Sequence, residues 1–107
     1  MTAIALGLDK DSLSKTFING ANYLSPPAMD LSKSKLGEVI TGFHRDFGII
    51  TVHAPTRFEG LSAWMLTGEK VSVKIPDRHL RIQAGKQLEW LTGGYLKAGF
   101  HEVIHNR

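Results

Sequence analysis

Short segments rich in β-branched or alternating apolar residues fill the sequence from residue 49 onward, and turn residues separate them. Val71-Ser72-Val73-Lys74-Ile75 alternates apolar and polar residues, and similar segments lie at 49–53, 61–65, 80–84 and 100–105. A period of two places every second side chain on the same face of a β-strand. Short strands with a turn about every 8–12 residues predict an antiparallel sandwich or roll.

Two stretches depart from this strand pattern. Residues 9–18 carry an apolar stripe at helical spacing that ends at Asn19-Gly20, which predicts one short N-terminal helix. Residues 86–91 also have helical spacing and end at a Thr-Gly-Gly turn. Residues 67–70, Thr-Gly-Glu-Lys, are typical of a hairpin turn, whereas the Pro- and Ser-rich stretch 21–37 is expected to be extended chain and loop.

Composition excludes several classes of protein. A chain of 107 residues supports one domain, and the absence of Cys excludes a Cys-based zinc finger, an iron–sulfur centre and a thiol nucleophile. The 13 Lys and Arg exceed the 10 Asp and Glu by three, and they are spread along the sequence, so we expect no nucleic-acid partner. No segment reaches the roughly 18–20 apolar residues of a membrane span, so we expect a cytoplasmic protein without a membrane partner.

The segment Gly42-Phe43-His44-Arg45-Asp46-Phe47-Gly48 carries the clearest chemical signal. His44 and Asp46 are two residues apart, so in an extended chain their side chains project to the same face. A histidine and a carboxylate supply two of the three ligands of the 2-His-1-carboxylate triad of non-haem Fe(II) oxygenases. His-x-Asp alone is common, and the alternative is a surface turn with a local His–Asp hydrogen bond.

A third ligand would come from one of four other histidines. His53 is expected to face away from the pair or to lie too far along its strand, and His79 lies in a charged loop. His105 is close to the end of the sequence. His101 lies in an alternating strand that follows a Gly-rich turn, so its position makes it the best candidate.

Several ordered motifs together resemble a known family. They are His44–Thr51, Gly60-Leu61, Val73–Pro76, Gln83–Tyr95 and His101–Val103, and His101 follows Asp46 by 55 positions. In this order and spacing the motifs resemble the core of the isopenicillin N synthase-like Fe(II)/2-oxoglutarate-dependent dioxygenases.

The resemblance implies a fold, a site and an activity. The fold would be mainly β, a double-stranded β-helix (a cupin-like jelly roll), with residues 1–107 as a single core domain. His44, Asp46 and His101 would hold Fe(II), and 2-oxoglutarate and O₂ would take the remaining positions. The implied reaction oxidises a C–H bond of a small-molecule substrate while 2-oxoglutarate is decarboxylated to succinate.

The sequence also departs from the family. An Asn-x-Tyr pair usually helps to seat 2-oxoglutarate; here Asn22 supplies the Asn, but Leu24 replaces the Tyr. The family's Arg-x-Ser, about ten residues past the distal His, is not matched by Arg107, and the regions that flank the core are missing. We therefore expect a core that is incomplete at both ends, with exposed apolar surface. The alternatives are a non-catalytic jelly-roll remnant or interaction module, and an enzyme of this class that does not use 2-oxoglutarate.

Overall fold

The computed structural model describes residues 1–25, 30, 32–56 and 59–106. Arg107, Pro26 and Pro27 lie outside the described residues. Three short helices are α1 (Thr2–Ala5), α2 (Ser14–Phe17) and α3 (Lys86–Leu91). The strands are β1 (Val39–His44), β2 (Ile50–His53), β3 (Leu61–Trp64), β4 (Lys70–Ser72), β5 (Arg81–Ala84) and β6 (His101–Ile104).

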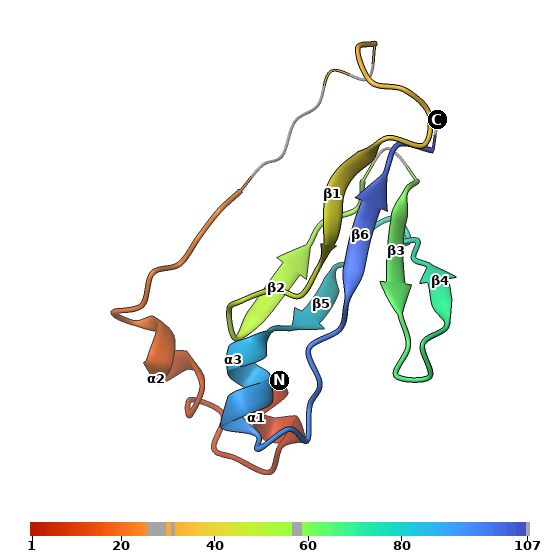
Figure 1. The fold of residues 1–107 in the computed structure, drawn as a ribbon. Coiled ribbons are helices and arrows are strands. Elements are labelled where there is room, and N and C mark those ends of the chain that lie inside the picture. The colour runs from red at the N-terminus through yellow and green to blue at the C-terminus, as the bar shows by residue number, and fades with distance from the viewer. Residues whose placement is uncertain (26–29, 31, 57–58, 107) are drawn as a thin grey trace.

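The strands form two antiparallel sheets. One has the order β1-β6-β3-β4 and the other pairs β2 with β5 (Figure 1). The chain leaves the larger sheet after β1, returns for β3 and β4, and leaves again for β5 before it ends in β6. Strands that alternate between two sheets are the hallmark of a jelly roll, so the expected mainly β, double-stranded β-helix core is confirmed.

The helices agree with the sequence in part. α3 covers the expected 86–91. The helix expected over 9–18 is reduced to the four residues of α2, whose N-terminus has no side-chain cap, and α1 adds a second helix to the N-terminal region. In the part of the chain that is described, no helix is long and apolar enough to cross a membrane.

Few apolar side chains are buried. Among the described residues Ala3, Leu88 and Ala98 are the buried apolar ones, whereas Gln83, His101 and His105 are buried polar residues. Large apolar side chains are exposed on many elements, as the sequence led us to expect. Two of the buried polar residues, Gln83 of the smaller sheet and His101 of the larger one, are hydrogen-bonded to each other between the two sheets.

Aromatic residues that a folded chain would normally bury lie at the surface. Phe43 and Trp90 are 53% and 68% exposed, although their size predicts core positions. Phe43 lies on the face of β1 opposite to His44, where it stacks on Phe100 at a centroid distance of 4.4 Å and meets the edge of Trp64 at 4.6 Å. Two basic side chains lie over this small aromatic cluster: Arg45 is 4.8 Å from the centroid of the Phe100 ring, and Lys70 Nζ is 5.2 Å from that of the Trp64 ring.

The loop after β1 is held against the start of α3. The Lys86 amide donates to the Asp46 carbonyl at 2.9 Å, and the Gly85 amide donates to the Ile49 carbonyl at 3.0 Å. A Cβ at Gly85 would lie 2.1 Å from the carbonyl oxygen of Gly48, so this approach requires glycine. The backbone of Asp46 is thereby fixed in place.

Candidate metal centre

Three side chains with metal-binding atoms converge between the two sheets. His44 is the last residue of β1 and His101 the first of β6, and the two are register partners. Asp46 follows in the connection to β2, and its Oδ1 lies 3.4 Å from His44 Nε2 and 3.7 Å from His101 Nε2. The potential ligand atoms of all three lie within 4.8 Å of one another. The structure thus brings together residues that are distant in the sequence.

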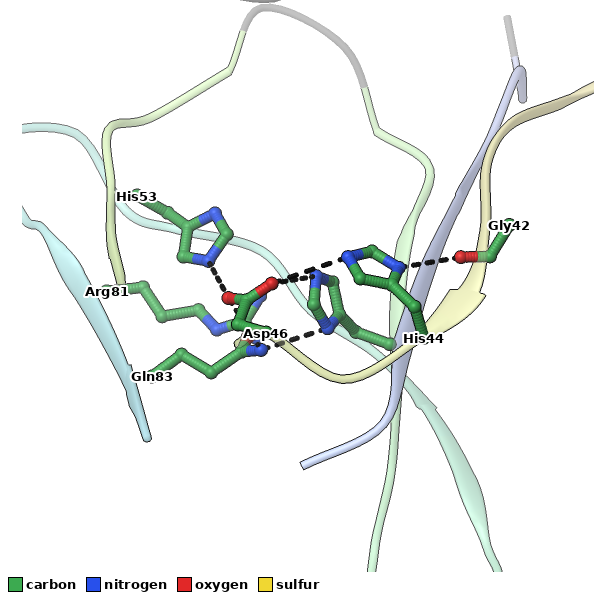
Figure 2. A network of polar contacts seen from close by, with 7 residues as sticks. Gly42, His44, Asp46, His53, Arg81 and Gln83 are labelled. Atoms are coloured by element: carbon green, nitrogen blue, oxygen red, sulfur yellow. Dashed lines mark hydrogen bonds and ion pairs between the residues drawn. The ribbon is translucent and has the colours of Figure 1, made fainter. Parts of the chain in front are cut away.

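The His44 ring is oriented by the backbone. Its Nδ1 donates a hydrogen bond to the Gly42 carbonyl at 2.7 Å (Figure 2). A carbonyl can only accept, so in the neutral ring the proton resides on Nδ1 and the lone pair on Nε2. Because Nε2 faces Asp46, the imidazole presents its free lone pair to the centre of the cluster, as metal-binding histidines do.

Gln83 positions the other two side chains. It lies on β5, is 6% exposed, and its Nε2 donates to Asp46 Oδ2 at 3.1 Å. The same nitrogen donates to His101 Nδ1 at 2.9 Å, so in the neutral ring the proton of His101 lies on Nε2 and must move to Nδ1 before Nε2 can bind a metal. The Gln83 amide, from the smaller sheet, therefore holds both the Asp46 carboxylate and the His101 imidazole.

Burial favours the neutral form of His101. Burial is the largest effect and lowers the pKa of this imidazole; Asp46 opposes the shift, and the neighbouring His44 and Arg81 add to it. A neutral imidazole is the form that binds a metal.

The residues fit a divalent metal ion. Two ligands in adjacent positions, each about 2.1 Å from an ion, lie about 3 Å apart. The distances of 3.4 and 3.7 Å from Asp46 to the two imidazoles are close to that value, so small side-chain movements would complete the coordination. Two imidazoles and one carboxylate are a donor set suited to Fe(II).

The structure also adds a residue that we had expected to face away. His53, at the end of β2, has its Nε2 3.9 Å from Asp46 Oδ2, and its ring meets the His101 ring edge-on at a centroid distance of 5.9 Å. The expectation treated residues 44–53 as one continuous strand. It was wrong because the chain changes sheets after Asp46, so β2 faces β6 across the site.

Arg81 also belongs to this site and was missed from the sequence. It is the register partner of His53 on β5. Arg81 and Gln83 point inward, whereas Ile82 between them is 58% exposed. The available signal was the alternation of Arg-Ile-Gln, but amphipathic reasoning assigns the apolar residue, not the polar pair, to the interior.

The remaining candidates lie elsewhere. His79 is in an exposed turn, where its Nδ1 bonds the Asp77 carbonyl at 2.9 Å. His105 is buried and contacts the Ser34 hydroxyl. Asn22 is exposed, and its amide donates to the Phe17 carbonyl at 3.2 Å, at the end of α2. The segment that follows α2 runs to the side of the sheets (Figure 1). The structure does not bring Asn22 to the triad, and its contact with 2-oxoglutarate stays a prediction.

A comparison with protein families identifies the class. The family model of the 2OG-Fe(II) oxygenase superfamily matches residues 17–107, which include His44, Asp46 and His101. The chain therefore belongs to the 2OG-Fe(II) oxygenase superfamily, whose cofactors are Fe(II) and 2-oxoglutarate. A comparison with curated proteins finds no match.

Solved structures support the same fold. A full-length protein from Neurospora crassa, solved in complex with alpha-KG, is similar at 24% identity and a TM-score of 0.61, over 65% of this chain and 22% of that one. A putative oxygenase from Shewanella oneidensis is similar at 25% identity and a TM-score of 0.61, over 75% and 29% of the two chains. This chain thus spans less than a third of the length of either protein.

Proposed function

We propose that residues 1–107 form an incomplete core domain of a non-haem Fe(II)- and 2-oxoglutarate-dependent dioxygenase of the isopenicillin N synthase-like group. His44, Asp46 and His101 hold the iron in this proposal. The convergence of their ligand atoms within 4.8 Å, in a chain of this superfamily, is the observation that carries it. Asn22 is a further, weaker candidate for contact with 2-oxoglutarate.

The proposed reaction uses one O₂ to oxidise two molecules. A small-molecule substrate R–H, 2-oxoglutarate and O₂ give R–OH, succinate and CO₂, and iron supplies the redox chemistry. The chain's own residues arrange the reactants: three protein ligands leave positions for 2-oxoglutarate and O₂. The Gly42 carbonyl orients His44 and Gln83 holds the Asp46 carboxylate, which limits the rearrangement that these two ligands need for metal binding.

Absorption spectroscopy tests the proposal. Anaerobic addition of Fe(II) and 2-oxoglutarate to the 107-residue chain should produce the visible metal-to-ligand charge-transfer band of a chelated 2-oxoacid. His101→Ala should abolish the band, whereas His79→Ala, which changes an exposed histidine, should retain it. Formation of succinate under air, measured with and without His101→Ala, gives an independent readout.

The outcomes separate the alternatives. Iron binding without the band would contradict the proposed use of 2-oxoglutarate and favour a non-catalytic remnant or a co-substrate-free enzyme. A band that persists in His101→Ala would contradict the assigned ligands.

A further inference from the structure

Two buried nitrogen atoms of the described residues lack a hydrogen-bond partner, and both are in one place. They are His53 Nε2 and Arg81 Nη1. Their residues face each other as register partners across the β2–β5 pair. A buried polar group without a partner costs free energy, so two of them side by side indicate that a polar group is missing between or beside them.

The unpartnered atoms lie beside the candidate metal centre. His53 Nε2 is 3.9 Å from Asp46 Oδ2, and the other terminal nitrogen of Arg81, Nη2, donates to Gln83 Oε1. Figure 2 shows His53, Arg81 and Gln83 reaching toward Asp46 from one side, while His44 reaches it from the other. A ligand that touched the metal and extended toward the smaller sheet would meet these two residues.

The charge of the cluster favours an anion. Asp46 is the carboxylate that faces Arg81, and His53, the register partner of Arg81, lies beside the same carboxylate. With a divalent ion bound, one carboxylate and one guanidinium leave the site with two net positive charges. Arginine presents N–H groups in a planar fork that matches a carboxylate, and the His53 imidazole can donate one further N–H.

We infer that Arg81, supported by His53, binds the distal carboxylate of 2-oxoglutarate, so that the co-substrate is anchored from strand β5. This inference rests on the proposed function, because it needs a metal-bound 2-oxoacid beside the two residues. The dianion would satisfy the unpartnered Arg81 and His53 nitrogens and balance the two positive charges.

Two ligands that differ in the distal carboxylate test the inference. Anaerobic titrations of the Fe(II)-loaded 107-residue chain compare 2-oxoglutarate with 2-oxobutyrate, which chelates in the same way but lacks that carboxylate. The charge-transfer band and calorimetry, the latter with Mn(II) in place of iron, both report affinity without turnover. The variants are Arg81→Leu, Arg81→Lys and His53→Phe, and Lys74→Leu, which removes an exposed positive charge, is the control.

We expect Arg81→Leu to lower the affinity for 2-oxoglutarate about 10- to 100-fold and to leave the affinity for 2-oxobutyrate unchanged. Arg81→Lys should recover part of the loss, and His53→Phe should show a smaller loss with the same selectivity. Equal weakening of both ligands, or no weakening of either, would overturn the inference while the proposed function stands. A missing band with both ligands in the unmodified chain would instead overturn the proposed function.

Discussion

Replacement of Gln83 by Leu would remove the amide that links the two sheets at the candidate metal centre. Its Nε2 bonds both Asp46 Oδ2 at 3.1 Å and His101 Nδ1 at 2.9 Å, and the side chain is 6% exposed, so water cannot easily replace it. The bond to the carboxylate contributes about 1.5–3 kcal/mol and the bond to the imidazole about 0.5–1.5 kcal/mol. We therefore expect the free energy of unfolding of the metal-free chain to fall by about 2–4.5 kcal/mol.

The same change should weaken metal binding more than a purely structural role would. Loss of a residue that orients metal ligands typically lowers metal affinity about 10- to 100-fold. Competition between the chain and a chelator for Mn(II), under conditions where each variant is folded, measures this affinity. Gln87→Leu is the matched control, because the Gln87 side chain is exposed on α3 and only its backbone amide bonds the nearby loop, at the carbonyls of Phe47 and Gly48.

Denaturant unfolding and metal competition together test whether Gln83 positions the metal ligands. If Gln83→Leu binds Mn(II) as tightly as the unmodified chain, Gln83 does not position the ligands. If Gln87→Leu loses as much affinity as Gln83→Leu, the effect belongs to the segment around α3 and not to the hydrogen bonds of Gln83.

Three further predictions concern the surroundings of the site. Gly85→Ala forces a Cβ against the Gly48 carbonyl and should lower the free energy of unfolding by about 1–3 kcal/mol, whereas Gly99→Ala, with open space around it, should not; urea titration compares them. Burial depresses the pKa of His101 below the ordinary imidazole value of 6.5, so the unfolded metal-free chain binds the proton more readily. The contribution of His101 to the free energy of unfolding should be complete above about pH 6.5 and should decline as the pH falls toward the folded-state pKa. Urea titrations across that pH range would show the decline. Arg45→Leu removes the ion pair between Arg45 and Glu89, which lies outside the candidate metal centre, and should leave the affinity for Mn(II) unchanged. A clear loss of Mn(II) affinity would contradict the placement of Arg45 outside the metal centre.

Much of the fold could be predicted from the sequence because strand alternation is a local property. Residues 61–64, 81–84, 86–91 and 101–104 form the expected elements, and the turn at 67–70 joins β3 to β4 as a hairpin. β1 was not delimited, because Gly42 interrupts its apolar pattern and its pairing with β6 is irregular there. Strand pairing between distant segments is invisible to a local pattern, so the division into two sheets came from the resemblance.

The residues of the candidate site also fall into those that could be predicted from the sequence and those that could not. His44 and Asp46 could be found from their spacing, and His101 from its strand and the family motifs, and the structure brings the three together. His53, Arg81 and Gln83 could not be assigned, because their inward orientation depends on how β2 and β5 pair and face β6. Two polar residues alternating with an exposed Ile82 are a signal that becomes readable once the sheet is known.

Crystals of the 107-residue chain grown anaerobically with Mn(II) and 2-oxoglutarate would test the central claim most directly. Anomalous scattering should place one Mn(II) about 2.1 Å from His44 Nε2, a carboxylate oxygen of Asp46 and His101 Nε2. A metal bound elsewhere, or a 2-oxoglutarate that does not chelate it, would contradict the account.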